Sequence, residues 1–237
     1  NNADYGTAIV GTVSGTSISF GSEVSVNTSG TRYLSAVFDS NSNKVVVVYK
    51  DDNNSQYGTA RVGTVSGTSI SFGTPVVFEA ATTYDKAAVY DPDTGKIVIA
   101  YRDFSNSNYG TAIVGTVSGT SISFGTAVVY NSALTIVANN GSGAVYDTTN
   151  DKVVIAYKDG GNSNYGTAIV GTVSGTSISF GSETVFNTGN TIDPSVAFDS
   201  DNSKIIISYR DSGNSSYGTA VVGTVSGTSI SFGSGVV

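Results

Sequence analysis

The 237-residue chain contains no cysteine, histidine, methionine or tryptophan. Without cysteine and histidine it has no thiol or imidazole chemistry, no disulfide and no sulfur or nitrogen ligand for a metal. A bound metal would have to be a hard cation held by oxygen atoms. The composition therefore predicts that the protein carries no cofactor and no metal centre.

Basic residues are also scarce, with 11 Lys and Arg against 18 Asp and Glu, a net charge of −7 and a pI near 4.3. Phosphate backbones and anionic membrane surfaces require a basic surface, so we expect neither nucleic-acid binding nor membrane insertion. The sequence has no apolar run of membrane-spanning length and no signal-like start. Because it opens with Asn1 rather than Met, we expect a fragment or a mature product.

One seventeen-residue stretch, Tyr5 to Gly21, organises the whole chain. Nearly the same residues return at Tyr57, Tyr109, Tyr165 and Tyr217, at intervals of 52 residues, or 56 in one case. Self-similarity at such a period is typical of solenoids, propellers and repeat arrays. The chain is therefore interpreted as a single domain, 1–237, with repeats that start near residues 5, 57, 109, 165 and 217.

Each period contains four segments rich in β-branched residues, separated by Gly, Asn, Asp and Ser. In the first full period they are strand A (Ser35–Phe38), strand B (Val45–Tyr49), strand C (Gly58–Val65) and strand D (Ser69–Phe78). Strand B has no polar face, which predicts a strand covered on both sides, whereas strand D alternates. The turn residues 27–30 are expected to end the preceding strand D.

Four antiparallel strands in each period predict an all-β fold, a β-propeller of four-stranded antiparallel blades with strand A innermost and strand D at the rim. About five blades are expected, one of them incomplete, at the N-terminal hairpin 5–26. A β-solenoid is the first alternative, but its coils are shorter. A row of sandwich domains is the second, but each would need about 100 residues.

The strand count is uneven, because five C–D hairpins flank only four A–B pairs. The strand C edge at residues 6–13 is thus left with free backbone groups, and we expect it to pair with another chain or with an upstream segment. Four extra residues fall within 128–143, between one strand D and the next strand A. They are interpreted as a tolerated insertion, or as a cap on one end of the axis.

The loops from strand B to strand C carry the most distinctive polar pattern, a Lys or Arg followed by Asp and then, after a few polar residues, by Tyr-Gly. A ring of such loops would offer cations, carboxylates and an aromatic face of the kind that recognises sugar hydroxyls. The structural alternative is a solvated ion pair at a strand end. The candidate ligand-binding residues are Lys50, Asp51, Arg102, Asp103, Lys158, Asp159, Arg210, Asp211, Tyr57, Tyr109, Tyr165 and Tyr217.

The turns between strands A and B begin with Asp39, Asp91, Asp147 and Asp199 and resemble the start of a calcium loop, but they lack its later Gly and bidentate Glu. Local hydrogen bonds from the Asp side chain to the turn backbone are the favoured interpretation. An active site needs unlike groups around one substrate, so nearly identical repeats predict that the protein is not an enzyme.

The pattern Asp193–Asp199, Lys204–Asp211 and Tyr217–Ala220 resembles blades of propellers built from very similar tandem copies. In architecture the chain is similar to the five-bladed tachylectin-type lectins, and in its Gly/Thr/Ser-rich style it is similar to repeats of secreted and phage-fibre proteins. The resemblance covers nearly the whole chain. It implies blade topology; the sugar pockets of those lectins use Trp, so it transfers no binding residue to this sequence.

Together these observations predict a non-enzymatic, multivalent binding module for glycans or other cell-surface molecules, extracellular or virion-associated. The competing interpretation is a structural or assembly subunit of an extracellular or virion fibre. A third is an engineered repeat scaffold without a native ligand.

Overall fold

The computed structural model describes residues 4–138 and 141–237, and within these ranges the chain forms 21 strands and no helix. These ranges accordingly contain no helix that could cross a membrane. Every strand pairing is antiparallel, and the same pairing pattern recurs along the chain. The prediction of an all-β fold built from repeated antiparallel strand units is confirmed.

Each full period forms a four-stranded meander, here called a unit: unit 1 spans residues 31–82, unit 2 spans 83–134, unit 3 spans 135–190 and unit 4 spans 191–237. Residues 4–30 form a half-unit, which has strands C and D alone. The strands are β1 (Tyr5–Ala8), β2 (Gly11–Ser14), β3 (Ser17–Phe20), β4 (Val24–Asp39), β5 (Lys44–Asp51), β6 (Tyr57–Ser66), β7 (Ser69–Phe72), β8 (Val76–Asp91), β9 (Lys96–Asp103), β10 (Tyr109–Ser118), β11 (Ser121–Phe124), β12 (Val128–Val137), β13 (Ala144–Asp147), β14 (Lys152–Asp159), β15 (Tyr165–Ser174), β16 (Ser177–Phe180), β17 (Thr184–Asn187), β18 (Thr191–Asp199), β19 (Lys204–Asp211), β20 (Tyr217–Ser226) and β21 (Ser229–Phe232).

Long strands cross from one unit to the next. The first half of β8 pairs with β6 of unit 1 up to Thr82, and its second half pairs with β9 of unit 2 from Thr83 onward. The predicted turn at residues 27–30 is therefore wrong, because β4 runs through it and pairs with β1 and then β5. Only between β17 and β18 does the crossing lose its strand geometry. The crossing lies at the same end of the units as the B–C loops, since Thr83 N donates to Gln56 O of one loop and Phe104 N of the next donates to Thr82 O.

Consecutive units pack face to face, and each has a forward face toward its C-terminal neighbour and a rear face toward its N-terminal neighbour. The forward face of unit 1 presents Val46, Val48, Ala60 and Val62, and the rear face of unit 2 presents Ile97, Ile99, Tyr101 and Ile113. Equivalent residues meet between units 2 and 3 and between units 3 and 4. The prediction that strand B is covered on both sides is confirmed for β5, β9 and β14.

A glycine at the end of the C–D hairpin marks the interface that follows the half-unit and each of units 1 to 3. A Cβ built on Gly73 would lie 1.9 Å from the carbonyl oxygen of Thr120 in the next unit, so only glycine allows this backbone approach. The same 1.9 Å approach recurs for Gly21 with Thr68, Gly125 with Thr176, and Gly181 with Thr228. The inter-unit contact is thus repeated in detail along the chain.

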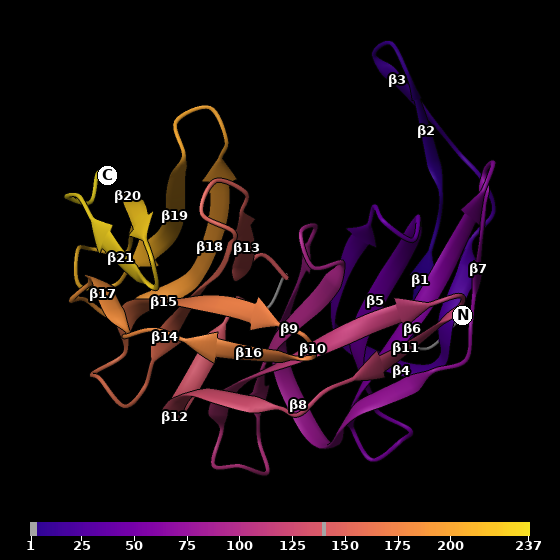
Figure 1. Ribbon diagram of the computed structural model, residues 1–237, viewed down its shortest axis with the longest axis horizontal. Coiled ribbons are helices and arrows are strands. Elements are labelled where there is room, and N and C mark those ends of the chain that lie inside the picture. Colours follow the sequence, from indigo (N-terminus) through magenta and orange to yellow (C-terminus); the bar gives the residue numbers. More distant parts are fainter. Residues whose placement is uncertain (1–3, 139–140) are drawn as a thin grey trace.

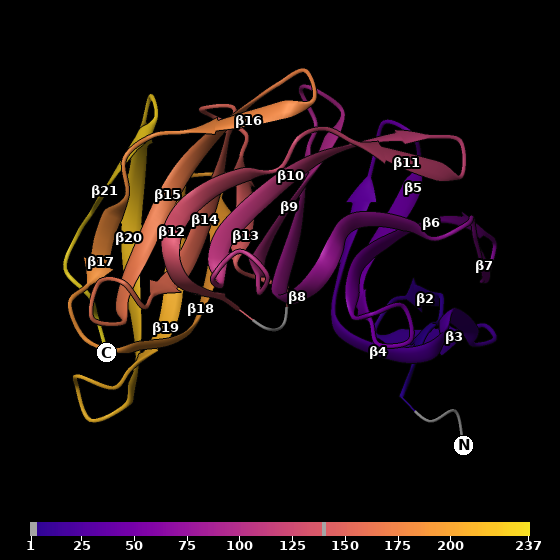
Figure 2. The same ribbon diagram turned by 90° about the horizontal axis from the view of Figure 1, so that it is seen from below.

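The units follow one another along an arc, with the half-unit and unit 1 at one end and unit 4 at the other (Figure 1). In Figure 2 the D strands β16 and β11 lie at the top of the molecule and β7 lies at its right side. A propeller implies a ring, and here the sheets do not close: unit 4 forms a separate sheet, β18-β19-β20-β21, and β1 ends the long sheet at the opposite extreme.

The four-residue insertion lies inside strand A of unit 3, between β12 and β13. Residues 139–140 fall outside the described ranges, but the neighbouring residues reach two other units. Val196 N of unit 4 donates a 2.8 Å hydrogen bond to Ser142 O, and Gly141 packs on Ser35 of unit 1. Residues 141 and 142, which follow the insertion, therefore contact the inner strands of units 1 and 4.

Candidate functional site

The aspartates of the B–C loops hold the loops themselves together. Asp51 Oδ1 accepts hydrogen bonds from Ser29 Oγ and Asn53 N, and Asp103 Oδ1 accepts from the backbone N–H groups of residues 105 and 106. Asp159 and Asp211 each accept one from the glycine two residues later, at 2.9 Å. These carboxylates cap tight turns, as Asp does when it bonds to a backbone N–H group two residues on.

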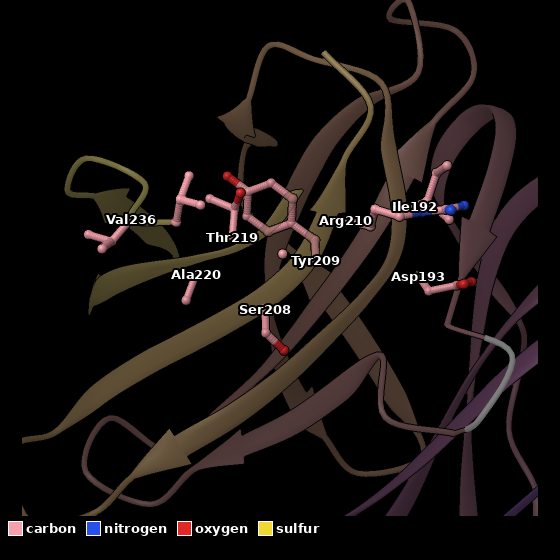
Figure 3. Close-up of a pocket in the computed structure, with 10 residues that line it drawn as sticks. Ile192, Asp193, Ser208, Tyr209, Arg210, Thr219, Ala220 and Val236 are labelled. Carbon is pink, nitrogen blue, oxygen red and sulfur yellow. The ribbon is translucent and has the colours of Figure 1, made fainter. Parts of the chain in front are cut away.

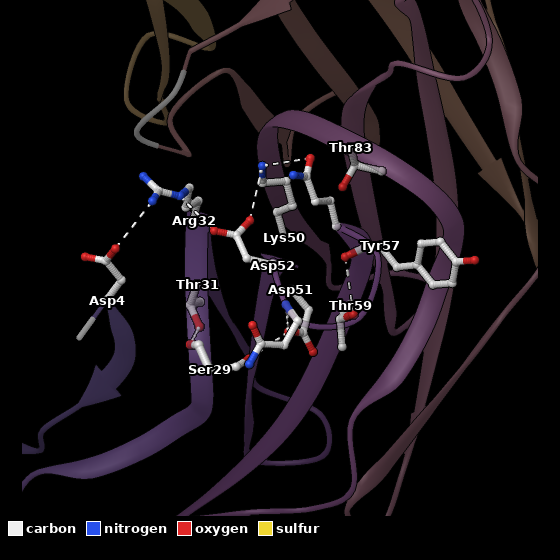
Figure 4. A network of polar contacts seen from close by, with 12 residues as sticks. Asp4, Ser29, Thr31, Arg32, Lys50, Asp51, Asp52, Tyr57, Thr59 and Thr83 are labelled. Carbon is white, nitrogen blue, oxygen red and sulfur yellow. Dashed lines mark hydrogen bonds and ion pairs between the residues drawn. The ribbon is translucent and has the colours of Figure 1, made fainter. Parts of the chain in front are cut away.

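Two of the four cations in the same loops form ion pairs, and in both cases the partner is not the adjacent Asp. Lys50 is buried, and its Nζ lies 3.2 Å from Asp52 Oδ1 and 3.3 Å from Gln56 Oε1 (Figure 4). Arg102 Nε lies 2.8 Å from Asp85 Oδ2. Lys158 is half-buried, whereas Arg210 is exposed. The four loops are therefore chemically unequal despite their similar sequences.

The tyrosines that follow these loops lie apart from the charges. Tyr57, Tyr109 and Tyr165 are half-buried and Tyr217 is exposed. In Figure 4 the Tyr57 ring points away from Lys50 and Asp51. In this loop the tyrosine ring therefore does not pack behind Lys50 and Asp51 as predicted.

Side chains of units 1 and 2 instead converge on a group that we call the hub cluster: Tyr33, Lys50, Tyr84, Asp85, Lys86, Arg102 and Phe104. The Tyr33 and Tyr84 rings meet edge to face with centroids 5.5 Å apart, and the Phe104 ring lies 5.7 Å from Tyr84. Lys50 Nζ and Arg102 Cζ stand 5.0 and 4.7 Å from the Tyr84 centroid. Cations at this distance from an aromatic face are attracted by its quadrupole.

A bulge in strand A makes this convergence possible. The pairing of β8 with β9 shifts register between Tyr84 and Ala87, and Asp85 has φ of 44°. Tyr33 and Asp193 have φ of 54° and 48° at the equivalent bulges. Left-handed backbone is uncommon for tyrosine and more frequent for aspartate, and at these bulges it turns the side chains of strand A toward the hub.

The hub also buries two charged groups side by side. Asp85 is 2% and Lys86 1% exposed, and Lys86 Nζ donates to Thr83 O at 3.2 Å. Burial lowers the pKa of Lys86 to about 7, against the attraction of Asp85, and burial raises the pKa of Asp85 to about 6 despite Arg102. Both shifts arise because desolvation disfavours the charged form of each group.

Five hub residues, Tyr33, Tyr84, Asp85, Lys86 and Phe104, were not predicted from the sequence, whereas Lys50 and Arg102 were among the candidate residues. The repeats are nearly identical, but they differ at the bulge of strand A, where Leu34, Lys86 and Pro194 occupy equivalent positions. The signal was available in the sequence: this is the place where otherwise similar copies differ in charge and shape.

The A–B turns match the interpretation of locally bonded aspartates. Asp39 Oδ1 accepts from Asn41 N and Ser42 N, and Asp91 Oδ1 accepts in the same way from residues 93 and 94. Each turn ends with a positive φ, at Asn43, Gly95, Asp151 and Ser203. Within residues 4–138 and 141–237, no acidic cluster of the kind that binds a metal occurs.

An open groove of about 650 Å³ lies on unit 4, where β19 and β20 meet the end of the chain (Figure 3). Asp193, Ser208, Arg210, Thr219 and Val236 are among its lining residues. Arg210, predicted as a ligand-binding residue, therefore lines this groove on unit 4, whereas the hub cluster is built from residues of units 1 and 2. Comparison of the sequence with protein-family models and with curated proteins finds no match.

Proposed function

We propose that the chain is a non-enzymatic binding module for glycans, an open β-propeller whose recognition surface is the hub cluster. The observation that carries the proposal is the convergence of three aromatic rings with Lys50 and Arg102 from two different units. Sugars are bound by apolar ring faces stacked on aromatics together with hydrogen bonds from fixed polar groups, and the hub cluster offers both kinds of group.

Phe104 is the part of this surface most open to a ligand, with 53% of its area exposed. It stands beside Tyr84, whose ring is held by Tyr33 on another side and by Arg102. A pre-organised aromatic surface of this kind binds a ligand without a large ordering cost. Lys50 and the Arg102–Asp85 pair would supply the hydrogen bonds to the sugar. The loops near Lys158 and Arg210 differ from those of the hub cluster and would be weaker, separate sites. An extracellular or virion location follows from this proposal.

A glycan array with the wild-type chain and two matched variants tests the proposal. Phe104→Ala removes the exposed hub aromatic, and Phe20→Ala removes an equally exposed phenylalanine of β3, remote from the hub. We expect wild-type binding to a defined set of glycans, loss of about tenfold or more in Phe104→Ala, as for one stacking aromatic, and no change in Phe20→Ala. Absence of binding to every glycan would reject the proposal.

A structural or assembly role is the second candidate, favoured by the two open ends of the arc. Val222 on the forward face of unit 4 is 48% exposed, and Ile18 of the half-unit is 54% exposed. Large apolar side chains exposed at both ends of a stack of units are candidates for contacts with other chains. Ordered assemblies seen by electron microscopy, together with an empty glycan array, would favour this role.

A further inference from the structure

The surfaces on the two sides of the opening between unit 4 and the half-unit have equivalents in the other units. In those units the equivalent surfaces are covered by a neighbouring unit. On one side stands the forward face of unit 4, and on the other stand β1 and the rear face of the half-unit (Figure 1). The inter-unit contacts of the chain show what covers each of these surfaces. The occupant of the opening can therefore be derived by comparison with units 1 to 3.

The forward face of unit 4 is the first incomplete surface. Val222 is 48% exposed, whereas the equivalent Val114 and Val170 are fully buried under the strand B residues of the next unit. Ile206 is likewise exposed, where the equivalent Val98 and Val154 are buried. This face is thus shaped to receive the rear face of another strand B, which in units 2 to 4 carries two Ile or Val residues and a Tyr.

The strand β1 is the second incomplete surface. In units 1 to 4, strand C pairs along seven residues with strand B, as in the register from Tyr109 with Asp103 to Gly115 with Ile97. Among the described residues β1 pairs only with β4, on its other edge. Its free edge has the hydrogen-bonding pattern that a strand B satisfies elsewhere.

The groove on unit 4 is the third incomplete surface. In units 1 to 3 an aromatic residue of the crossover strand lies over the glycine of strand C: Phe78 over Gly58, Tyr130 over Gly110 and Phe186 over Gly166, with ring atoms 2.4–2.6 Å from a Cβ built there. A Cβ on the equivalent Gly218 meets no described atom within 4 Å. Val236 pairs with Ala220 as Val128 pairs with Ala112, which places the open position directly beyond Val237.

We propose that this opening binds a polypeptide segment of defined pattern: an aromatic residue that enters the Gly218 groove, followed by a strand A and an apolar strand B that pairs with β1. One segment would cover the forward face of unit 4, satisfy the edge of β1 and fill the groove, as in strand-donation complexes. The segment 78–103 of this chain has the required pattern, since it begins with Phe78 and contains strands A and B of unit 2.

Binding is tested by adding a synthetic peptide of residues 78–103 to the 237-residue chain. We expect a 1:1 complex, a rise in the melting temperature of the protein and slower hydrogen exchange at residues 6–13, where β1 gains a partner strand. A Phe78→Ser peptide should bind at least about tenfold more weakly, because it lacks the anchor. An Ala80→Ser peptide is the matched control, because Ala80 is exposed in unit 1.

On the protein side, Gly218→Val fills the groove without a clash in the free chain and should abolish the complex. If the peptide is insoluble, the same residues fused after Val237 should produce the same protection of residues 6–13 and the same stabilisation. Peptide or fusion without protection at β1, equal binding of the two variant peptides, or self-association of the chain that excludes the peptide would each overturn the proposal. None of these outcomes depends on glycan binding.

Discussion

Residues 5–21 and 109–125 have the same sequence, YGTAIVGTVSGTSISFG, and differ in structure. The later copy forms one continuous strand, β10, followed by β11. In the first copy the same positions split into β1 and β2, with a break at Ile9 and Val10. Ile9 is 45% exposed, whereas its counterpart Ile113 is 3% exposed.

The difference arises from neighbours, because the local sequence is identical. β10 pairs with β9 on one edge and with β12 on the other, and it lies between two packed units. In the described part of the chain, β1 pairs only with β4, and β2 pairs only with β3. The propensity of the residues allows the whole segment to form a strand. Pairing with a strand B and packing against the next unit decide how long that strand becomes.

The largest effect is expected where the inter-unit contact is tightest. Gly125→Ala would place a Cβ 1.9 Å from Thr176 O, so we expect a loss of about 4 kcal/mol or more in the free energy of unfolding. Gly233→Ala changes the equivalent glycine of unit 4, where the nearest atom is 3.8 Å away, and should stay within about 0.5 kcal/mol. Urea denaturation of both variants measures this. Equal losses in the free energy of unfolding would show that the close contact at Gly125 is not what makes this glycine more sensitive than Gly233.

The comparison can be sharpened at the hub, where the copies differ in sequence. Lys86 loses its proton near pH 7 in the folded chain and near its ordinary pKa of 10.5 when unfolded. Between these values the unfolded state binds more protons, so stability should rise by about 3 kcal/mol from pH 7 to pH 9.5. Lys86→Met should remove this rise and raise the stability at pH 7.

Thermal denaturation across that pH range provides the measurement. Leu34→Met, at the equivalent bulge of unit 1, is the control and should keep the wild-type pH dependence. Asp85 acts at lower pH, because its raised pKa makes stability fall as pH rises from its ordinary pKa of 3.8 to about 6. A Lys86→Met variant with an unchanged slope above pH 7 would assign the pH dependence to other groups.

The smallest expected effect comes from removing one methyl group at two positions that have the same flanking sequence. Ile122→Val should cost about 1 kcal/mol, because Ile122 is 4% exposed and packs between units. Ile18→Val removes the same methyl group from the half-unit, where it is largely exposed, and should change the free energy of unfolding by less than about 0.5 kcal/mol. Chemical denaturation measures both; a similar cost at the two positions would mean that the half-unit is packed in solution.

Much of the fold follows from the pattern of the sequence, because the apolar runs of strand B and the alternation of strand D depend on the repeated environment. The prediction of burial on both sides fails for β19, where Ile206 is exposed, because none of the described residues forms a unit that packs on its forward face. The continuous crossing in β4 was not predicted, since residues 27–30 have turn composition. Their backbone groups find strand partners on β1, which local propensity does not show.

The candidate site was predicted only in part. Lys50 and Arg102 do belong to the hub cluster, but their partners are Asp52 and Asp85 rather than the adjacent aspartates. Asp51 and Asp103 serve their own turns. Lys50 meets a carboxylate of its own B–C loop, whereas the partner of Arg102 depends on the bulge of strand A, which the B–C loop does not encode.

Each structural unit begins in the middle of a crossing strand, whereas each sequence repeat begins at a Tyr-Gly. The two boundaries therefore lie at different places in the chain. Because β8 belongs to two units, excision of 52 residues between equivalent positions of two crossing strands joins the first part of one to the second part of the other. The junction keeps its register, and the shortened chain loses one whole unit. Duplication would add a unit in the same way, so unequal exchange within such a gene can lengthen or shorten the arc while each pair of neighbouring units keeps the same kind of interface.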